Sequence, residues 1–445
     1  MRARLGAWAI FTSCLIYAPT SVLAIDAYLK GSVEVEGQYF FEAGSELDQK
    51  QENASLSGQL AFDLFSDDGV HHLAFEPFGR VDWRDSDRSH FDLRQAKYQF
   101  AIDGFDLIIG VDKVYWGVME AVHLVDVINQ TDTVESMDGE EKLGQPMVRL
   151  SYESDWGTFT AFALPYFRER TFAGTGGRPR PDFRIDDSRT TYESGREEKH
   201  FDWAIRYQAY LGDFEIGLAH FQGTAREPEF TPIIYRNGEE FTSLACPPST
   251  SGQGIDVVAT VNDCLLLVGQ TLGLPLGEIG DIRVELAPHY SLMEQTSIDV
   301  QAVLGSWLVK AEALSRYQQS DRFMQVTAGV EYSFYGIFNT GADLGVIAEY
   351  VWDERGKAGL NPFQNDIFVG GRWALNDVSS TAILAGGAID LETGAAFLSL
   401  EAEQRLGGAF KVSVEARGFI DIPDDDPLFM ISDDSFAQLR LAWYF

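Results

Sequence analysis

Apolar and polar residues alternate along most of this chain with a period of two. In the final segment, 436–445, one face of an extended strand carries apolar residues, namely Ala437, Leu439, Leu441, Trp443 and Phe445. The positions between them include Gln438, Arg440 and Tyr444. Runs of about ten residues with one apolar and one polar face are typical of transmembrane β-strands. A soluble β-sandwich also alternates, but its connections are short at both ends.

The alternation predicts an all-β fold, a closed antiparallel transmembrane barrel of about 18 strands. The strands are expected near 28–41, 54–65, 70–84, 91–102, 105–116, 146–153, 156–167, 200–211, 213–223, 295–304, 307–317, 322–334, 343–353, 366–375, 379–390, 395–406, 409–420 and 435–445. A count of 16 remains open if two weak strands belong to loops. A further strand inside 282–293 would need a partner.

The expected connections are asymmetric. Turns of two to four residues, such as those at 103–104 and 212–213, alternate with longer segments near 42–53, 117–145, 168–199, 224–294, 354–365 and 421–434. Short periplasmic turns and long outer loops are typical of outer-membrane barrels.

The first residues resemble a secretory signal peptide. Arg2 and Arg4 precede an apolar stretch, and Val22 and Ala24 supply small residues at the cleavage site. We expect cleavage after Ala24, so residues 1–24 form the signal peptide and 25–445 the barrel. An uncleaved anchor is the alternative. No later apolar run is long enough for a transmembrane helix.

Charge and the lack of known catalytic motifs argue against several classes of function. The formal net charge of −34 argues against nucleic-acid binding, which requires basic surface. No nucleophile elbow, zinc-protease motif, Cys-x-x-Cys or phosphate-binding loop occurs, so the sequence predicts neither an enzyme nor a cofactor or metal site.

Two sequence features resemble known groups of proteins. The C-terminal pattern of Leu439, Leu441, Trp443 and Phe445 resembles the assembly signal of Gram-negative outer-membrane proteins. Gly110-x5-Trp116-Gly117, followed by Asp126-Val127-Ile128-Asn129-x-x-Asp132, resembles a motif of a porin-like outer-membrane family distantly similar to alginate-export channels. The resemblance implies a monomeric barrel. An alginate exporter would line its lumen with excess Arg and Lys to pass a polyanion, and this chain does not.

If apolar positions face lipid, the intervening charged positions face the lumen. The expected pore-lining residues are Arg80, Lys97, Arg149, Arg206, Lys310, Arg372, Arg405, Arg417, Glu76, Asp82, Glu312 and Glu331. The inward set also includes Glu34, Glu401, Glu403, Lys411, Glu415 and Arg440, and carries somewhat more acids than bases. Most of the excess negative charge therefore belongs to loops, where it either repels anions or bridges divalent cations of lipopolysaccharide.

The segment 117–145 is too apolar for a loop in solvent. Val118, Met119, Val122, Val125 and Ile128 predict an amphipathic turn or short helix. We expect it to fold into the lumen as a constriction, with a cap on the outer rim as the alternative. Its candidate polar residues are Glu120, His123, Asp126, Asn129 and Asp132.

The mature chain retains Cys246 and Cys264, both in the segment 224–294. Because the periplasm is oxidising, we expect them to pair, with two free thiols as the alternative.

Taken together, the sequence predicts an outer-membrane channel for passive diffusion of small or medium polar solutes. The expected partners are outer-membrane lipid and lipopolysaccharide, the outer-membrane assembly machinery and a small-molecule solute. A surface or adhesion protein is the alternative, and a lipid-modifying barrel enzyme is a further one.

Overall fold

The structure is a computed structural model that describes residues 25–44, 48–181, 183–241, 257–272, 282–356, 359, 361–424 and 426–445. The expected signal peptide, residues 1–24, lies outside the described residues. Eighteen strands form one sheet. They are β1 (Ile25–Phe40), β2 (Glu52–Ser66), β3 (His71–Asp82), β4 (Phe91–Ile102), β5 (Phe105–Asp112), β6 (Gln145–Ser154), β7 (Gly157–Leu164), β10 (Asp202–Leu211), β11 (Phe214–Thr224), β15 (Leu292–Leu304), β16 (Trp307–Gln318), β17 (Asp321–Phe334), β18 (Asp343–Asp353), β19 (Asn365–Ala374), β20 (Ala382–Asp390), β21 (Ala396–Leu406), β22 (Phe410–Ile420) and β23 (Phe436–Tyr444).

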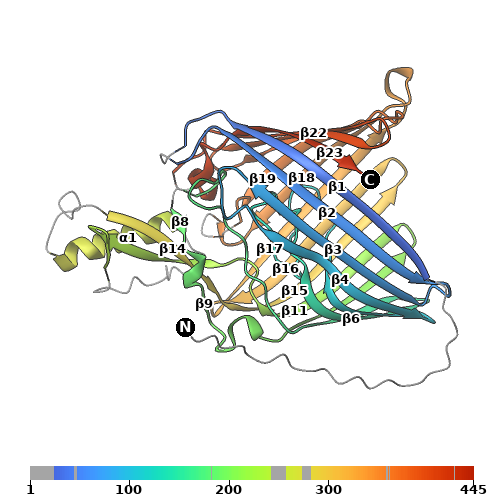
Figure 1. Cartoon of the computed structure of the whole chain (residues 1–445), viewed down its shortest axis with the longest axis horizontal. Helices are drawn as coiled ribbons and strands as arrows, with labels where there is room; N and C mark the ends of the chain where they lie inside the picture. Colours follow the sequence, from blue (N-terminus) through green and yellow to red (C-terminus); the bar gives the residue numbers. More distant parts are fainter. Residues whose placement is uncertain are drawn as a thin grey trace, which may run out of the picture.

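The sheet closes on itself to form a barrel (Figure 1). Each strand pairs antiparallel with its neighbour, and the ring closes where β1 pairs with β23, with Glu36 opposite Arg440. Closure leaves no open strand edge, which lipid could not satisfy. The predicted fold class is confirmed, and of the two possible strand counts 18 is correct.

The outer face of the barrel is apolar. Successive side chains of a strand point to opposite faces, and the apolar residues occupy the outward positions. On β23, Leu439, Leu441 and Trp443 are exposed, whereas Arg440 forms ion pairs with Glu36 and Glu415 inside the ring. Exposed aromatic residues collect toward both ends of the strands. One group includes Tyr28, Phe105, Trp156, Tyr210, Trp307, Trp373 and Trp443, and the other includes Tyr39, Trp83, Phe91, Phe201, Tyr317 and Trp352.

The two ends of the barrel differ. At one end, here called the turn end, the strands are joined by connections such as 103–104, 155–156, 212–213 and 305–306. At the long-loop end lie 113–144, 165–201, 225–291 and 421–435. Two turn-end connections, 335–342 and 375–381, exceed four residues. The first agrees with the expected strands on either side of it and contains the 3-10 turn Ile337–Asn339, whereas the second is longer than the expected 376–378. At the long-loop end, 319–320 is a tight turn.

A small second sheet projects beyond the long-loop end. The pair β12 (Glu229–Arg236) and β14 (Ile282–Tyr290) continues β11 and β15 outward, and β13 (Glu239–Glu240), β8 (Arg184–Ile185) and β9 (Thr191–Tyr192) flank it. Helix α1 (Val257–Leu272) packs on this sheet, with Val261 against Leu286. Figure 1 shows β14, β8 and α1 standing clear of the barrel. A strand, β14, therefore does occur inside 282–293, a possibility that the sequence left open. It pairs with β12 in the small sheet, so neither strand belongs to the barrel.

Within the described part of the chain, no helix has the length and apolar character needed to cross a membrane.

Candidate functional site

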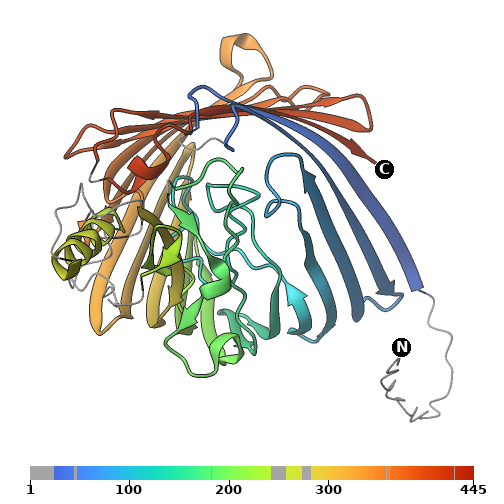
Figure 2. The same cartoon turned by 60° about the vertical axis from the view of Figure 1, so that its left-hand side comes forward.

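The segment 113–144, called the inserted loop from here on, leaves the wall after β5 and returns to it at β6. Asn129 holds the two arms of the loop together at its base. Its Oδ1 accepts a hydrogen bond from the backbone N–H of Val114 at 2.9 Å, and its Nδ2 donates to the backbone oxygens of Asp112 and Leu143 at 2.9 and 2.8 Å. With its arms joined, the loop crosses the interior of the barrel as a unit (Figure 2).

Two carboxylates on the opposite wall hold the tip of the inserted loop. Glu312 of β16 accepts hydrogen bonds from the backbone N–H groups of Val118 at 2.6 Å, Met119 at 3.2 Å and Val125 at 3.2 Å. Glu349 of β18 accepts hydrogen bonds from the N–H groups of Glu120 at 3.0 Å and Ala121 at 2.8 Å. Hydrogen bonds to an ionised acceptor contribute about 1.5–3 kcal/mol each, so these contacts fix the tip firmly.

Apolar packing seals the loop against the wall on one side. Val125, Val127 and Ile128 are fully or almost fully buried in a cluster that reaches β6, β7, β10, β11 and β15. Nearer the tip, Leu124 packs with Leu314 and Phe323. These wall positions face inward yet are apolar, which departs from the usual polar lining of a barrel because the loop covers them.

Gly117 explains why the loop can approach the wall so closely. Its φ of 115° is rarely adopted by L-residues, and a Cβ there would lie 2.8 Å from Oε1 of Glu312. Trp116 beside it is buried in the same apolar cluster, and the guanidinium of Arg206 lies 5.0 Å from the centre of its ring. The Gly110–Asp132 motif noted in the sequence thus consists largely of residues that fold and dock the inserted loop.

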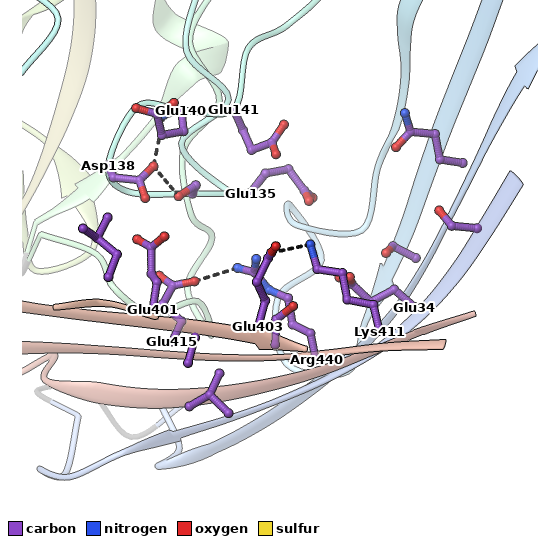
Figure 3. A pocket seen from close by; sticks show the side chains of 18 of the residues that line it. Glu34, Glu135, Asp138, Glu140, Glu141, Glu401, Glu403, Lys411, Glu415 and Arg440 are labelled. Atoms are coloured by element: carbon purple, nitrogen blue, oxygen red, sulfur yellow. Dashed lines mark hydrogen bonds and ion pairs between the residues drawn. The ribbon is translucent and has the colours of Figure 1, made fainter. Parts of the chain in front are cut away.

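The loop leaves a cavity of about 570 Å³ between its free edge and the other side of the barrel. Strands β1–β4 and β19–β23 supply the wall of this cavity, and residues 135–141 of the loop supply the facing edge. Figure 3 shows Glu135, Asp138, Glu140 and Glu141 on one side and Glu34, Glu401, Glu403, Lys411, Glu415 and Arg440 on the other. Charged side chains dominate the lining.

Ion pairs organise this lining. Arg80 pairs with Glu135 of the loop at 2.8 Å and with Glu36 at 3.4 Å. On the opposite wall of the cavity, Lys411 of β22 pairs with Glu403 of the neighbouring strand β21 at 2.6 Å. The loop is also tied to this wall, because Asp138 lies 3.0 Å from the buried guanidinium of Arg417, which in turn contacts Glu401 and Glu415.

The expected pore-lining residues fall into different environments. Nine residues from the sequence-based sets line the cavity, namely Glu34, Arg80, Glu120, Arg372, Glu401, Glu403, Lys411, Glu415 and Arg440. Arg206, Lys310 and Glu312 instead lie under the inserted loop, in contact with Asp299, Glu349 and the loop backbone. Four more of the expected residues form ion pairs: Lys97 and Arg149 with Asp112, Glu76 with Lys113, and Asp82 with Arg88. Arg417 is buried. In the strand register, Glu331 lies opposite Ile347 and Arg405 lies opposite Lys411.

Asp126 does not face the cavity, contrary to the expectation that it would contact a solute. Its side chain is 3% exposed and pairs with Lys142 at 3.2 Å. Burial raises the pKa of Asp126, while the charge of Lys142 acts to lower it. Asn129 and Asp132 are buried too, the first at the base of the loop and the second against Arg94 at 2.8 Å. These three residues stabilise the loop and are not available to a solute in the cavity.

His123 follows the tip residues that Glu312 and Glu349 hold. Its Nε2 is 2.7 Å from Glu140, which lines the cavity. Burial acts to lower the pKa of His123, but the hydrogen bond and charge of Glu140, with further carboxylates at Glu312 and Asp126, raise it above its usual value. His123 therefore acts on the cavity through Glu140.

Sequence reasoning missed Arg94 and the edge 135–141. Arg94 was overlooked because the β3–β4 register shifts between Glu76 and Pro77, so Asp92 and Arg94 face inward together with Lys97 further down the strand. Pro77, which cannot donate to a ladder, was a signal for this irregularity. The run from Glu135 to Glu141 carries four acids, but nothing in its pattern indicated which way it faces.

A second segment, within the connection 165–201, covers part of the long-loop end. Arg178 pairs with Asp434 at 2.5 Å, and the backbone N–H of Gly174 donates to Asp85 at 3.1 Å. A small space of about 30 Å³ lies beside this segment, and Arg88, Arg178 and Phe436 are among the residues that line it.

Cys264 is buried in α1 beside Ile234 and Val268. Cys246 lies outside the described residues, so the pairing of these two cysteines stays a prediction.

No protein-family model and no curated protein sequence matches the chain. Among solved structures, the chain is similar to engineered variants of the Rhodopseudomonas blastica porin. One is 10% identical with a TM-score of 0.41, and another 11% identical with a TM-score of 0.42; each match covers 94% of this chain and 100% of the porin. A structure titled "Asymmetric conductivity of engineered proteins" gives 10% identity, the same coverage and a TM-score of 0.41. Likeness at this level establishes neither a family nor a function, and the resemblance to alginate-export channels gains no support.

Proposed function

We propose that this protein is a porin-like channel of the Gram-negative outer membrane, through which small or medium polar solutes diffuse passively. The observation that carries the proposal is the charged cavity of about 570 Å³ inside a closed barrel of 18 strands. A barrel of this width leaves more interior space than its own wall side chains fill. Hydrated carboxylates and guanidinium groups along that space favour water and polar solutes over lipid.

The outer surface supports membrane insertion. Exposed Leu, Val and aromatic residues cover the strands, and aromatic groups gather toward both strand ends. Such an apolar band flanked by aromatic girdles matches a bilayer with its two interfaces. We further propose that the mature chain, after removal of residues 1–24, is inserted as a monomer by the outer-membrane assembly machinery, with lipopolysaccharide around its long-loop end.

The inserted loop would set the size limit for solutes. It fills the side of the lumen in front of β6–β18 through its apolar clusters, and its tip is fixed by Glu312 and Glu349. A solute must then pass between the edge 135–141 and the wall formed by β1, β22 and β23.

Single-channel recording of the purified mature protein in planar bilayers tests this function. We expect discrete, long-lived conductance steps that disappear when the same preparation is boiled before addition. A protein that inserts and shows heat-modifiable mobility but never conducts would contradict a channel and favour an adhesion or surface role. Incubation of the same protein with labelled phospholipid tests for a lipid-modifying enzyme.

A further inference from the structure

We infer that the cavity admits cationic solutes in preference to anionic ones, and that Glu140 and Glu141 of the inserted loop are its main selectivity-determining residues. This inference rests on the proposed channel function and assigns its substrate class.

The balance of charge around the cavity is the first observation. Nine carboxylates line it, from Glu34, Glu120, Glu135, Asp138, Glu140, Glu141, Glu401, Glu403 and Glu415. Six basic side chains face them, from Arg80, Arg94, Lys113, Arg372, Lys411 and Arg440. The lining therefore carries an excess of three negative charges when all groups are ionised.

The pairing of these groups increases the asymmetry. Each of the six basic side chains has a carboxylate within 4.0 Å. Several of these partners lie behind the cavity surface: Arg94 is held by Asp132 at 2.8 Å, and Arg440 by Glu36 at 3.2 Å. Each positive charge in the lining is thus held by a carboxylate, in part from behind the cavity surface, and offers little to a passing anion.

The acids of the loop edge are compensated less. Among the described residues, Glu141 has no Lys, Arg or His nitrogen within 4.0 Å of its carboxylate, and it is exposed. The carboxylate of Glu140 pairs, among the described residues, with the imidazole of His123 alone, and its side chain is 57% exposed. Both line the cavity (Figure 3), so their field acts directly on a solute there.

The magnitude of the effect follows from electrostatics in a confined space. A local potential of about −1 kT per elementary charge raises the cation concentration roughly threefold and lowers that of anions by the same factor. Low-dielectric walls reduce screening compared with an open surface. We therefore expect a K⁺ over Cl⁻ permeability ratio of roughly 3 to 10 for the wild-type channel.

Reversal potentials in a KCl gradient across a planar bilayer test the inference. The variant E140Q/E141Q removes two charges from the edge without changing side-chain size, and we expect its permeability ratio to fall at least about twofold toward unity. The matched control D424N/D433N removes two exposed charges from the connection between β22 and β23, and its ratio should stay within about 20% of the wild-type value.

Liposome swelling with lysine and glutamate extends the test to organic solutes of similar size. We expect lysine to enter faster than glutamate, with the difference reduced in E140Q/E141Q. A conducting wild-type channel with a ratio at or below unity would overturn the inference and leave the proposed function standing. An unchanged ratio in E140Q/E141Q would also overturn it, whereas absence of conductance would instead contradict the proposed function.

Discussion

Oε1 of Glu312, on strand β16, accepts a hydrogen bond of 2.6 Å from the backbone N–H of Val118, at the tip of the inserted loop. This contact joins two elements on opposite sides of the lumen. A carboxylate that accepts several backbone N–H groups is replaced poorly by an amide, because the amide nitrogen turns a donor toward those donors. The position of the loop, and thus the width of the passage, depends on this pairing.

Replacing the two anchoring carboxylates should widen the passage. We expect E312Q/E349Q to loosen the tip by several kcal/mol, since each carboxylate accepts at least two backbone hydrogen bonds worth about 1.5–3 kcal/mol apiece. Single-channel recording should show larger and noisier conductance. The control is E331Q, an inward-facing position on β17 for which no hydrogen bond or ion pair to the loop is found among the described residues. Conductance equal to wild type in E312Q/E349Q would mean that the loop is held by its apolar packing alone.

The pH dependence of selectivity should follow His123. Its pKa is raised above the usual value of about 6.5, so the protonated form is favoured in the folded protein. The stabilising charge pair with Glu140 is therefore fully present below about pH 6.5 and is lost as pH rises through the raised pKa. Because protonated His123 offsets the charge of Glu140, cation preference should increase with pH, with a midpoint above about 6.5. Reversal potentials between pH 5.5 and 8.5 measure this, and H123Q should give a flat profile over the same range. A midpoint below about 6 would contradict the assignment.

A charge on the outer face should destabilise the barrel, whereas the same charge on the inner face should be tolerated. Leu400 of β21 is exposed on the outer face, and Ser413 of the neighbouring β22 lines the cavity. We expect L400R to lower the free energy of unfolding in lipid by about 2–4 kcal/mol, and S413R to change it by less than about 1 kcal/mol. Urea titration of the protein in lipid vesicles compares them. Equal stability of the two variants would show that β21 does not contact lipid at Leu400.

Removing the terminal residue should impair closure of the barrel. Phe445 exchanges two backbone hydrogen bonds of 3.0 Å with Gly31 of β1, and its ring lies over Gly31, where a Cβ would meet it at 2.5 Å. We expect deletion of Phe445 to reduce the amount of heat-modifiable protein in the membrane severalfold, while F445Y retains it. Wild-type levels after the deletion would exclude a role for this residue in assembly.

The strands were predictable because their pattern is local. Each one separates lipid from lumen by itself, so the alternation seen in 436–445 or 398–405 is visible without knowing the partner strand. The exception is the pair β12 and β14. Only their pairing with each other shows that they form a separate sheet, and this pairing is not visible in the sequence of either segment. The inserted loop was indicated by its own apolar residues, which need a surface to cover them.

The lining of the cavity was not predictable in the same way. The alternation predicts that Arg206, Lys310 and Arg80 all face inward. The docked loop then decides which of them remains open to the lumen. Asp126 lies on a loop without periodicity, and its burial against Lys142 is a tertiary contact. The register shift at Pro77 hid Arg94 for a similar reason, since a bulge changes which positions share a face.

The central claim is that solutes pass between the edge of the inserted loop and the wall of β22. Single cysteines at Ser413 and, as the matched control, at Leu400 test it most directly, in a background with C246S/C264S. Each channel is recorded in a planar bilayer before and after addition of a bulky, charged thiol reagent. We expect the reagent to reduce the conductance of S413C by more than half and to leave that of L400C unchanged. Conductance of S413C that stays constant, although mass spectrometry shows the thiol fully modified, would contradict this path.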